Sequence, residues 1–124
     1  KELDQMIVDN ELSQAKLIGN VEIIQGGLLL YADFVLVTYS KNQSKIDAIF
    51  ARDNVVLISV NDRATANEAD YNLERGSIVM TGNVLVSQDG NTVSADRVEF
   101  DIDSGAASMS GRVKSVLLPP TEQD

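Results

Sequence analysis

The stretch from Ile78 to Asp101 reads IVMTGNVLVSQDGNTVSADRVEFD, and it contains the features that decide the fold. Two runs rich in valine and other aliphatic residues flank the turn signal Asp89-Gly90-Asn91. Two such runs around a glycine-containing turn are typical of a β-hairpin. The stretch therefore predicts a pair of antiparallel strands.

This pattern recurs 63 residues earlier in one gapless register. The eight identical positions are Gly19-Asn20-Val21, Gln25, Gly27, Ala32-Asp33 and Val35, which match Gly82-Asn83-Val84, Gln88, Gly90, Ala95-Asp96 and Val98. Weaker copies begin at Asp53 and Gly111, each 29 residues from Gly82. Repeats of this length form stacked units that bury their apolar faces only against their neighbours.

The repeat predicts an all-β fold of about ten or more short antiparallel strands built from hairpins. Gly19, Gly82 and Gly111 fall inside strands, where glycine marks a bulge or a bend. The alanine-rich segment 63–71 has helical propensity, but it occupies a strand position of the repeat and is assigned as strand. We expect one domain over residues 1–118 and a polar tail over 119–124, because Pro119-Pro120 cannot continue a ladder.

Composition excludes several classes of function. The chain of 124 residues contains no histidine and no cysteine, which removes the usual catalytic bases, thiolate nucleophiles and zinc ligands. We therefore expect no enzymatic activity and no cofactor. The net charge of −9 disfavours binding to nucleic acid or to an anionic membrane surface.

Repeated carboxylates are the remaining candidates for chemistry. Asp33 and Asp96 hold equivalent positions, and Asp101 and Asp103 flank the second strand pair. Paired carboxylates could act as acid and base or hold calcium. The alternative is structural, because aspartate beside hairpins accepts backbone N–H bonds at the solvent face. We favour this structural role and expect no metal site.

Alternation places a set of apolar residues on one face of the predicted strands. These residues are Leu17, Val21, Ile23, Val35, Val37, Val55, Leu57, Ile78, Met80, Val84, Val86, Val98, Phe100, Met109 and Val113. They form either an ordinary core or the lining of a groove for an apolar ligand. Periodicity alone does not choose between the two.

The two ends of the chain carry short apolar segments that we expect at the sheet edges. The residues in question are Met6, Ile7, Val8, Arg112, Val113, Lys114, Val116 and Leu117. Edges with little charged protection invite the addition of a strand from another chain. Both ends are therefore predicted contact sites for a second copy or a partner.

Almost the whole chain resembles the OstA-like proteins of lipopolysaccharide transport. The resemblance rests on Gly19-Asn20-Val21, Ala32-Asp33, Thr81-Gly82-Asn83-Val84 and Ala95-Asp96-Arg97-Val98. Its most specific part is the closing segment, Gly111-Arg112-Val113-Lys114-Ser115-Val116-Leu117-Leu118-Pro119.

That resemblance implies an open, twisted β-jelly roll in the periplasm, whose groove shields the acyl chains of lipid A during transport from the inner to the outer membrane. It also implies head-to-tail oligomers and LptC-like and LptD-like partners. Two alternatives remain open. The chain is an OstA-like domain of a partner component, LptC-like or the LptD amino-terminal domain, or it is a β module that binds carbohydrate or protein without lipid.

Overall fold

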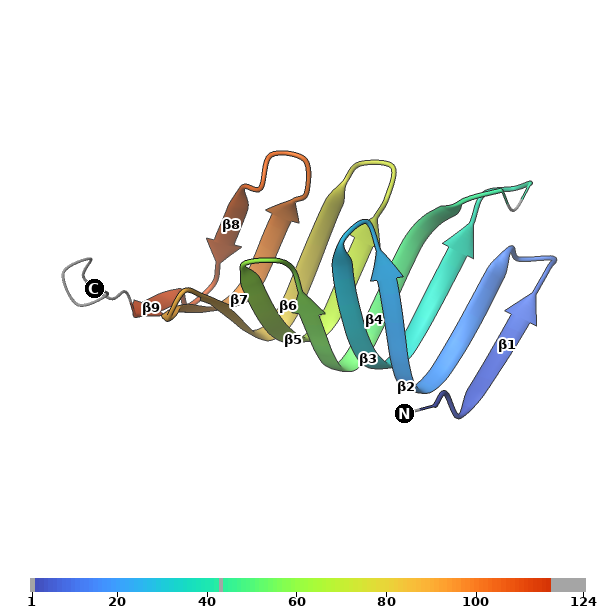
Figure 1. The fold of residues 1–124 in the computed structure, drawn as a ribbon, viewed down its shortest axis with the longest axis horizontal. Coiled ribbons are helices and arrows are strands. Elements are labelled where there is room, and N and C mark those ends of the chain that lie inside the picture. Colours follow the sequence, from blue (N-terminus) through green and yellow to red (C-terminus); the bar gives the residue numbers. More distant parts are fainter. Residues whose placement is uncertain (1, 43, 117–124) are drawn as a thin grey trace.

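The computed structural model describes residues 2–42 and 44–116, and it confirms the all-β fold class. The strands in these residues are β1 (Gln5–Asp9), β2 (Gln14–Gln25), β3 (Leu28–Tyr39), β4 (Ile46–Ile58), β5 (Asp62–Asn72), β6 (Ser77–Gln88), β7 (Asn91–Asp101), β8 (Ala107–Ser110) and β9 (Lys114–Val116). They form one open antiparallel sheet in chain order from β1 to β8, and β9 pairs with β7 (Figure 1).

The central strands are longer than the sequence pattern suggested, and the described residues contain nine strands. The reason is that the Gly-Asn and Asp-Asn pairs bend a strand without ending it. Strand β4 continues through Asp53-Asn54, which bend it without ending it. Strand β5 covers the alanine-rich segment, so the strand assignment of residues 63–71 is confirmed.

Each bend is a bulge with two consecutive residues at positive φ. In β6, Gly82 and Asn83 have φ of 82° and 50°, and in β2, Gly19 and Asn20 have φ of 79° and 53°. The pairing register between β6 and β7 shifts at this point, so that two residues of β6 stand opposite one residue of β7. Such bulges bend the strand and increase its twist. Because such a bulge occurs in β2, β4 and β6, all strands of the sheet bend at the same position along their length.

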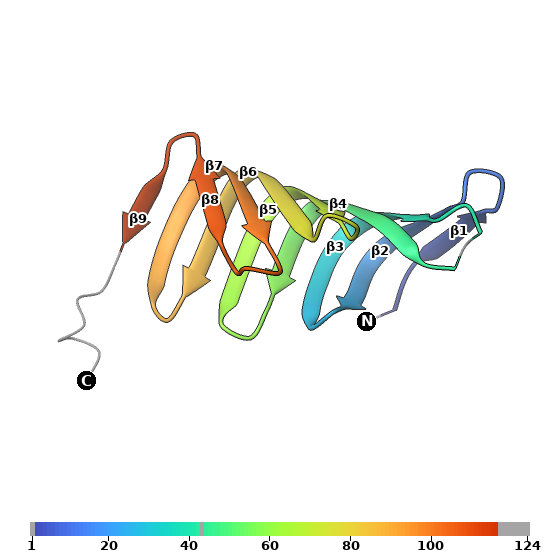
Figure 2. The same ribbon diagram turned by 90° about the horizontal axis from the view of Figure 1, so that it is seen from above.

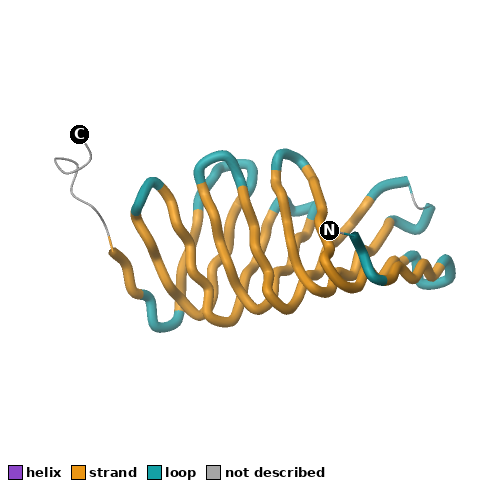
Figure 3. Tube along the Cα trace, turned by 60° about the horizontal axis from the view of Figure 1, so that its bottom comes forward, coloured by secondary structure: helices purple, strands orange, loops and turns teal. Residues whose placement is uncertain are grey.

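The bends fold the sheet into two layers (Figures 2 and 3). Layer one contains β1, β8, the first half of β2 and the strand halves joined by the loops at 40–45, 73–76 and 102–106. Layer two contains β9 and the strand halves joined by the turns at 26–27, 59–61 and 89–90. Apolar side chains of the two layers meet on the inner face, and the hairpin turns form the rim of the space between them.

Polar side chains reinforce the outer side of the bend. A Cβ atom added to Gly82 would lie 2.5–2.9 Å from side-chain atoms of Asn67, so the amide packs directly over this glycine. Asn54 Nδ2 donates a hydrogen bond of 2.7 Å to Asp33 Oδ2. Arg112 pairs with Asp96 at 2.8 Å. These two carboxylates thus bind side chains, Asn54 on β4 and Arg112 in the bend between β8 and β9, whereas the sequence had suggested backbone N–H groups as their partners.

The inner row of layer two beside the bend alternates valine with alanine. Its members, paired in order across the strands, are Val21, Ala32, Val55, Ala66, Val84 and Ala95. All six are buried. Because every second member is small, the larger side chains of layer one can approach closely at this level. The two layers therefore join into one tightly packed core along the bend.

Two further observations complete the fold. Within the described residues, no helix is long and apolar enough to cross a membrane. Leu117 and the polar tail predicted for residues 119–124 lie outside the part of the chain that the structure describes.

Candidate functional site

The space between the layers is filled beside the bend. Val35, Met80 and Val98 of layer one have no exposed surface, and Val21 and Val84 of layer two are 1% exposed. Protein interiors at this level of burial are as closely packed as organic crystals. The deep part of the groove thus has no room for a ligand in this conformation.

Farther from the bend, the layers separate and leave a cavity of about 140 Å³. Its apolar lining comes from both layers: Leu28, Leu57 and Ala64 from layer two, and Ile78, Phe100 and Ile102 from the side of layer one. Polar residues stand at its rim, namely Ser59, Asp62 and Asp101. A dry apolar cavity of roughly 150 Å³ is known to hold one benzene ring. This cavity therefore has room for a short apolar segment.

A second, much narrower cavity of about 10 Å³ lies beside the first. The two share Leu28, Leu57 and Ile78 as lining residues, and Ile23 and Tyr71 border only the narrow one. A space of this size accommodates at most one water molecule. The apolar lining is therefore continuous from one cavity to the next.

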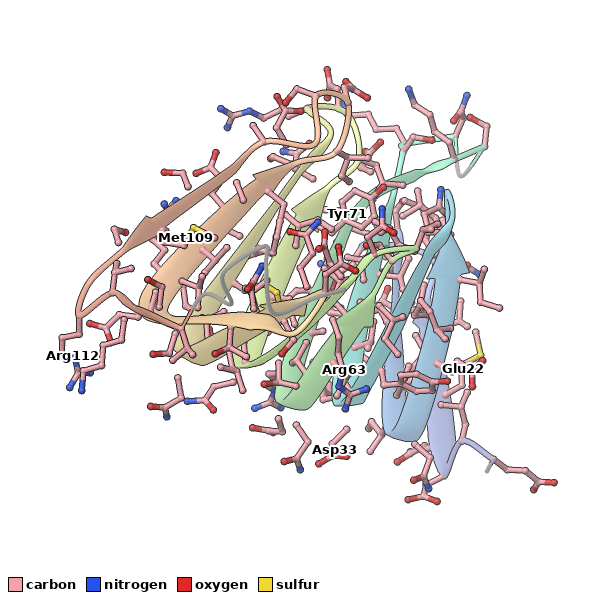
Figure 4. All side chains as sticks on the ribbon, turned by 60° about the vertical axis from the view of Figure 1, so that its left-hand side comes forward. Glu22, Asp33, Arg63, Tyr71, Met109 and Arg112 are labelled. Carbon is pink, nitrogen blue, oxygen red and sulfur yellow. The ribbon has the colours of Figure 1, made fainter. Side chains whose placement is uncertain are left out.

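Tyr71 brings a hydroxyl group to this lining. It is half-buried on β5 and lies between the layers (Figure 4). Burial raises the pKa of the Tyr71 phenol above its ordinary value of 10.0, and the negative charge of Asp103 adds to this effect. The phenol is thus neutral at physiological pH, and the groove interior carries no charge at this position.

The structure brings together fourteen of the fifteen residues predicted to form the core or line a groove. Ten are buried, namely Val21, Val35, Val37, Val55, Leu57, Ile78, Met80, Val84, Val86 and Val98, and four are half-buried, namely Leu17, Ile23, Phe100 and Met109. Val113 lies apart from this cluster and is 49% exposed. Only Ile23, Leu57, Ile78 and Phe100 of the set border the two cavities.

Sequence reasoning missed several residues of the cavity lining. Leu28 shares the parity of Leu30 and Ala32 on β3, which is a signal that the alternation could have supplied. Ala64 pairs with Leu57 and Val86, but the alanine-rich sequence around it conceals the inner face of β5. Ile102 lies in the loop after β7, where no strand periodicity applies.

The two ends of the sheet present unpaired edges. All five residues of β1 are exposed, including Met6 at 54%, Ile7 at 43% and Val8 at 58%. At the other end, β8 is largely exposed and Val116 of β9 is 64% exposed. Arg112 and Lys114 supply the positive charges near this end, and Asp96 raises the pKa of Arg112 by accepting its hydrogen bonds. Both predicted contact ends are thus accessible in the monomer.

Carboxylates do not assemble into a cation site in the part of the chain that the structure describes. No group of three or more aspartate or glutamate side chains lies close enough to hold a metal ion there. Asp33 and Arg112 point outward at the bend, away from the groove (Figure 4).

Comparison with a family model adds evidence of another kind. The model described as "LptA/(LptD N-terminal domain) LPS transport protein" matches residues 2–106. This match covers all strands up to β7 and includes the whole lining of the cavity.

Individual proteins are similar over nearly the whole chain. The lipopolysaccharide export system protein LptA of Escherichia coli (strain K12) is 27% identical, over 99% of this chain and 72% of that protein. An uncharacterized protein of Rhizobium meliloti (strain 1021) is 28% identical, over 98% of this chain and 72% of its own.

A solved structure has the same fold. LptH of Pseudomonas aeruginosa, described as the LptA-homologous periplasmic component of the lipopolysaccharide transport device, superposes with a TM-score of 0.86. The superposition covers 95% of this chain and 93% of LptH at 17% sequence identity. This likeness shows that the bent, open sheet is the fold of both proteins.

Proposed function

We propose that this chain, which belongs to the LptA/(LptD N-terminal domain) family of LPS transport proteins, binds lipopolysaccharide in the periplasm and holds its acyl chains between the two layers of the sheet. The sugars remain in water beyond the rim. The observation that carries the proposal is the apolar cavity of about 140 Å³ between the hairpin turns.

The chemistry of the lining supports this assignment. All buried hydrophobic side chains of the described residues gather between the layers, and none of the buried residues there is polar or charged. Each methylene group transferred from water to such an environment gains about 0.8 kcal/mol, so an acyl segment of roughly ten methylenes gains on the order of 8 kcal/mol gross. This attraction has no preferred direction, which lets a chain slide along the groove.

The size of the cavity adds one requirement. A volume that holds about one benzene ring is too small for whole acyl chains. Lipid binding therefore requires the layers to move apart at the rim while the core beside the bend stays packed. The turns at 59–61 and 102–106 both border the cavity, through Ser59 and Ile102, so this movement would carry them apart.

Transport across the periplasm further requires contacts between proteins. We propose that β1 of one copy adds to the β8–β9 end of the next in a head-to-tail arrangement, and that LptC-like and LptD-like components use the same two edges. Exposed strand edges with apolar side chains favour such additions, and both ends of the sheet have them.

A photo-crosslinking amino acid tests the proposal. We expect lipopolysaccharide adducts when the probe replaces Phe100 at the rim, and few or none when it replaces Met80 or Val84 in the packed core beside the bend. The matched control is Glu99, which neighbours Phe100 but points to the outer face. Equal labelling at Phe100 and Glu99, or labelling confined to the loops, would contradict lipid binding between the layers and favour a module that binds other ligands.

A further inference from the structure

The two best copies of the repeat differ on the outer face of the sheet. On the inner face and at the bend they agree, as Val21 matches Val84 and Val35 matches Val98. On the outer face of layer one, the N-terminal copy has three apolar residues where the second copy has polar ones. The pairs are Ile18 and Thr81, Phe34 and Arg97, and Leu36 and Glu99.

The second copy therefore acts as an internal control. It forms the same bent hairpin with threonine, arginine and glutamate at the outward positions, so the fold does not require apolar side chains there. A contiguous apolar patch at the surface of a protein marks an interaction site. Ile18, Phe34 and Leu36 are each half-buried on this face. The outer face of the N-terminal copy thus differs from that of the C-terminal copy in a way that the fold does not require.

The outward residues on β2 to β5 form one contiguous surface, which we call the outer patch. Its first cross-strand row is Lys16, Leu36, Phe50 and Asp70, and its second row is Ile18, Phe34, Arg52 and Glu68. The guanidinium of Arg52 stacks over the ring of Phe34 at 4.2 Å from the centroid. Each row thus ends in a carboxylate on β5, and apolar residues fill the centre.

The order of charges in the first row is self-complementary. A two-fold axis that runs parallel to the strands, midway between β3 and β4, would place Lys16 opposite the partner's Asp70. It would also place Leu36 opposite the partner's Phe50. In the second row, the same axis would place Arg52 opposite the partner's Phe34 and Glu68 opposite the partner's Ile18. An isologous contact of this kind requires a surface that matches itself in shape and charge.

We propose that the outer patch binds a second copy of this chain, so that two molecules pack side by side through layer one. The contact is distinct from the head-to-tail joint, which extends the sheet at its edges and leaves the outer face uncovered. It therefore allows two rows of stacked molecules to associate laterally. An anionic membrane is a poor alternative occupant, because the chain carries a net charge of −9.

The outer face of layer two does not have this property, although it also carries apolar residues. Its rows are Ile24, Leu29, Ile58 and Arg63, and Glu22, Tyr31, Val56 and Thr65. The same kind of two-fold axis would place Arg63 opposite an isoleucine and Glu22 opposite a threonine. Neither row of layer two therefore pairs opposite charges, whereas the first row of the outer patch pairs Lys16 with the partner's Asp70.

Sedimentation velocity of the lipid-free protein over a range of concentrations tests the proposal. We expect a reversible dimer, and we expect the exchanges Phe34→Arg and Leu36→Glu to raise its dissociation constant at least about tenfold. The second copy carries these same residues, so the variants should fold, which circular dichroism checks. The matched control Thr81→Arg adds a charge at the same outward level and should leave the dimer unchanged.

Reversing the charges of Lys16 and Asp70 distinguishes the proposed side-by-side contact from association at the sheet edges. Lys16→Asp and Asp70→Lys should each weaken the dimer about tenfold or more, because each change creates two repulsive pairs across the axis. The double variant should restore the wild-type constant. A protein that stays monomeric at all concentrations, single variants without effect, or a double variant that fails to recover would each overturn the proposal. Loss of mass only in variants of Val113 and Val116 would overturn it too, because association would then occur at the edges.

Discussion

The substitution Gly82→Ala is the sharpest test of the bend. Gly82 has a φ of 82°, and an added Cβ atom would lie 2.5, 2.8 and 2.9 Å from Asn67 Nδ2, Cβ and Cγ. A left-handed conformation costs an alanine about 1–2 kcal/mol. Displacing the packed amide costs about 1–3 kcal/mol more, as for other overpacked sites. We therefore expect a loss of roughly 3 kcal/mol in the free energy of unfolding.

The assay is thermal and urea unfolding, monitored by circular dichroism. For a domain of this size the loss corresponds to a fall in Tm of about 10 °C. Gly27→Ala is the matched control, because Gly27 has the same φ of 82° but no atom within 4 Å of the added Cβ. The control isolates the backbone cost, so the difference between the two variants measures the clash with Asn67. If Gly82→Ala is no more destabilising than Gly27→Ala, the close packing over the bend is refuted.

Three further predictions concern the bend, the groove and the edges. Asp53 occupies the position of Gly82 in the repeat with a φ of 68°, so Asp53→Gly should stabilise the protein by about 0.5–1 kcal/mol, measured by urea unfolding; a lower midpoint would contradict this. Because burial and Asp103 raise the pKa of Tyr71, its contribution to stability is present below pH 10 and is lost as the pH rises through the folded-state pKa. Tyr71→Phe should remove this part of the alkaline decline, and an unchanged difference between pH 8 and pH 11 would count against it. Aspartate at Val113 or Val116 should lower the mass of head-to-tail oligomers in light scattering while the thermal midpoint stays the same.

The repeat determines most of the strand arrangement, and for this reason the fold could be predicted from the sequence. The match between the copies at Gly19 and Gly82 places the bends, since only a few residue types adopt positive φ readily. The repeat also predicted a strand at residues 63–71 despite their helical propensity. In the structure this segment is β5, which pairs with both β4 and β6. The strand count was less accessible, as a bulge and a turn have similar sequences.

The sequence predicted which residues face the groove, but not how wide the groove is. Alternation determines the side to which a residue points and contains no information about the distance between the two layers. Val84 and Phe100 share the inner face, yet Val84 is buried beside the bend and Phe100 borders the cavity. Their difference depends on the level above the bend at which each residue lies. That level follows from the position of the bulge within each strand and from the register between neighbouring strands, which alternation within a single strand does not contain.

The central claim is that the layers open at the rim to admit acyl chains. Ser77 and Ser87 lie near opposite ends of β6, one in each layer. Spin labels on cysteines introduced at these two positions therefore report the distance between the layers by pulsed electron paramagnetic resonance spectroscopy. We predict that the distance between the labels increases by several ångströms when lipopolysaccharide is added. The control pair Ser77 and Ser108, both in layer one, should keep its distance. An unchanged Ser77–Ser87 distance at saturating lipid would contradict the account.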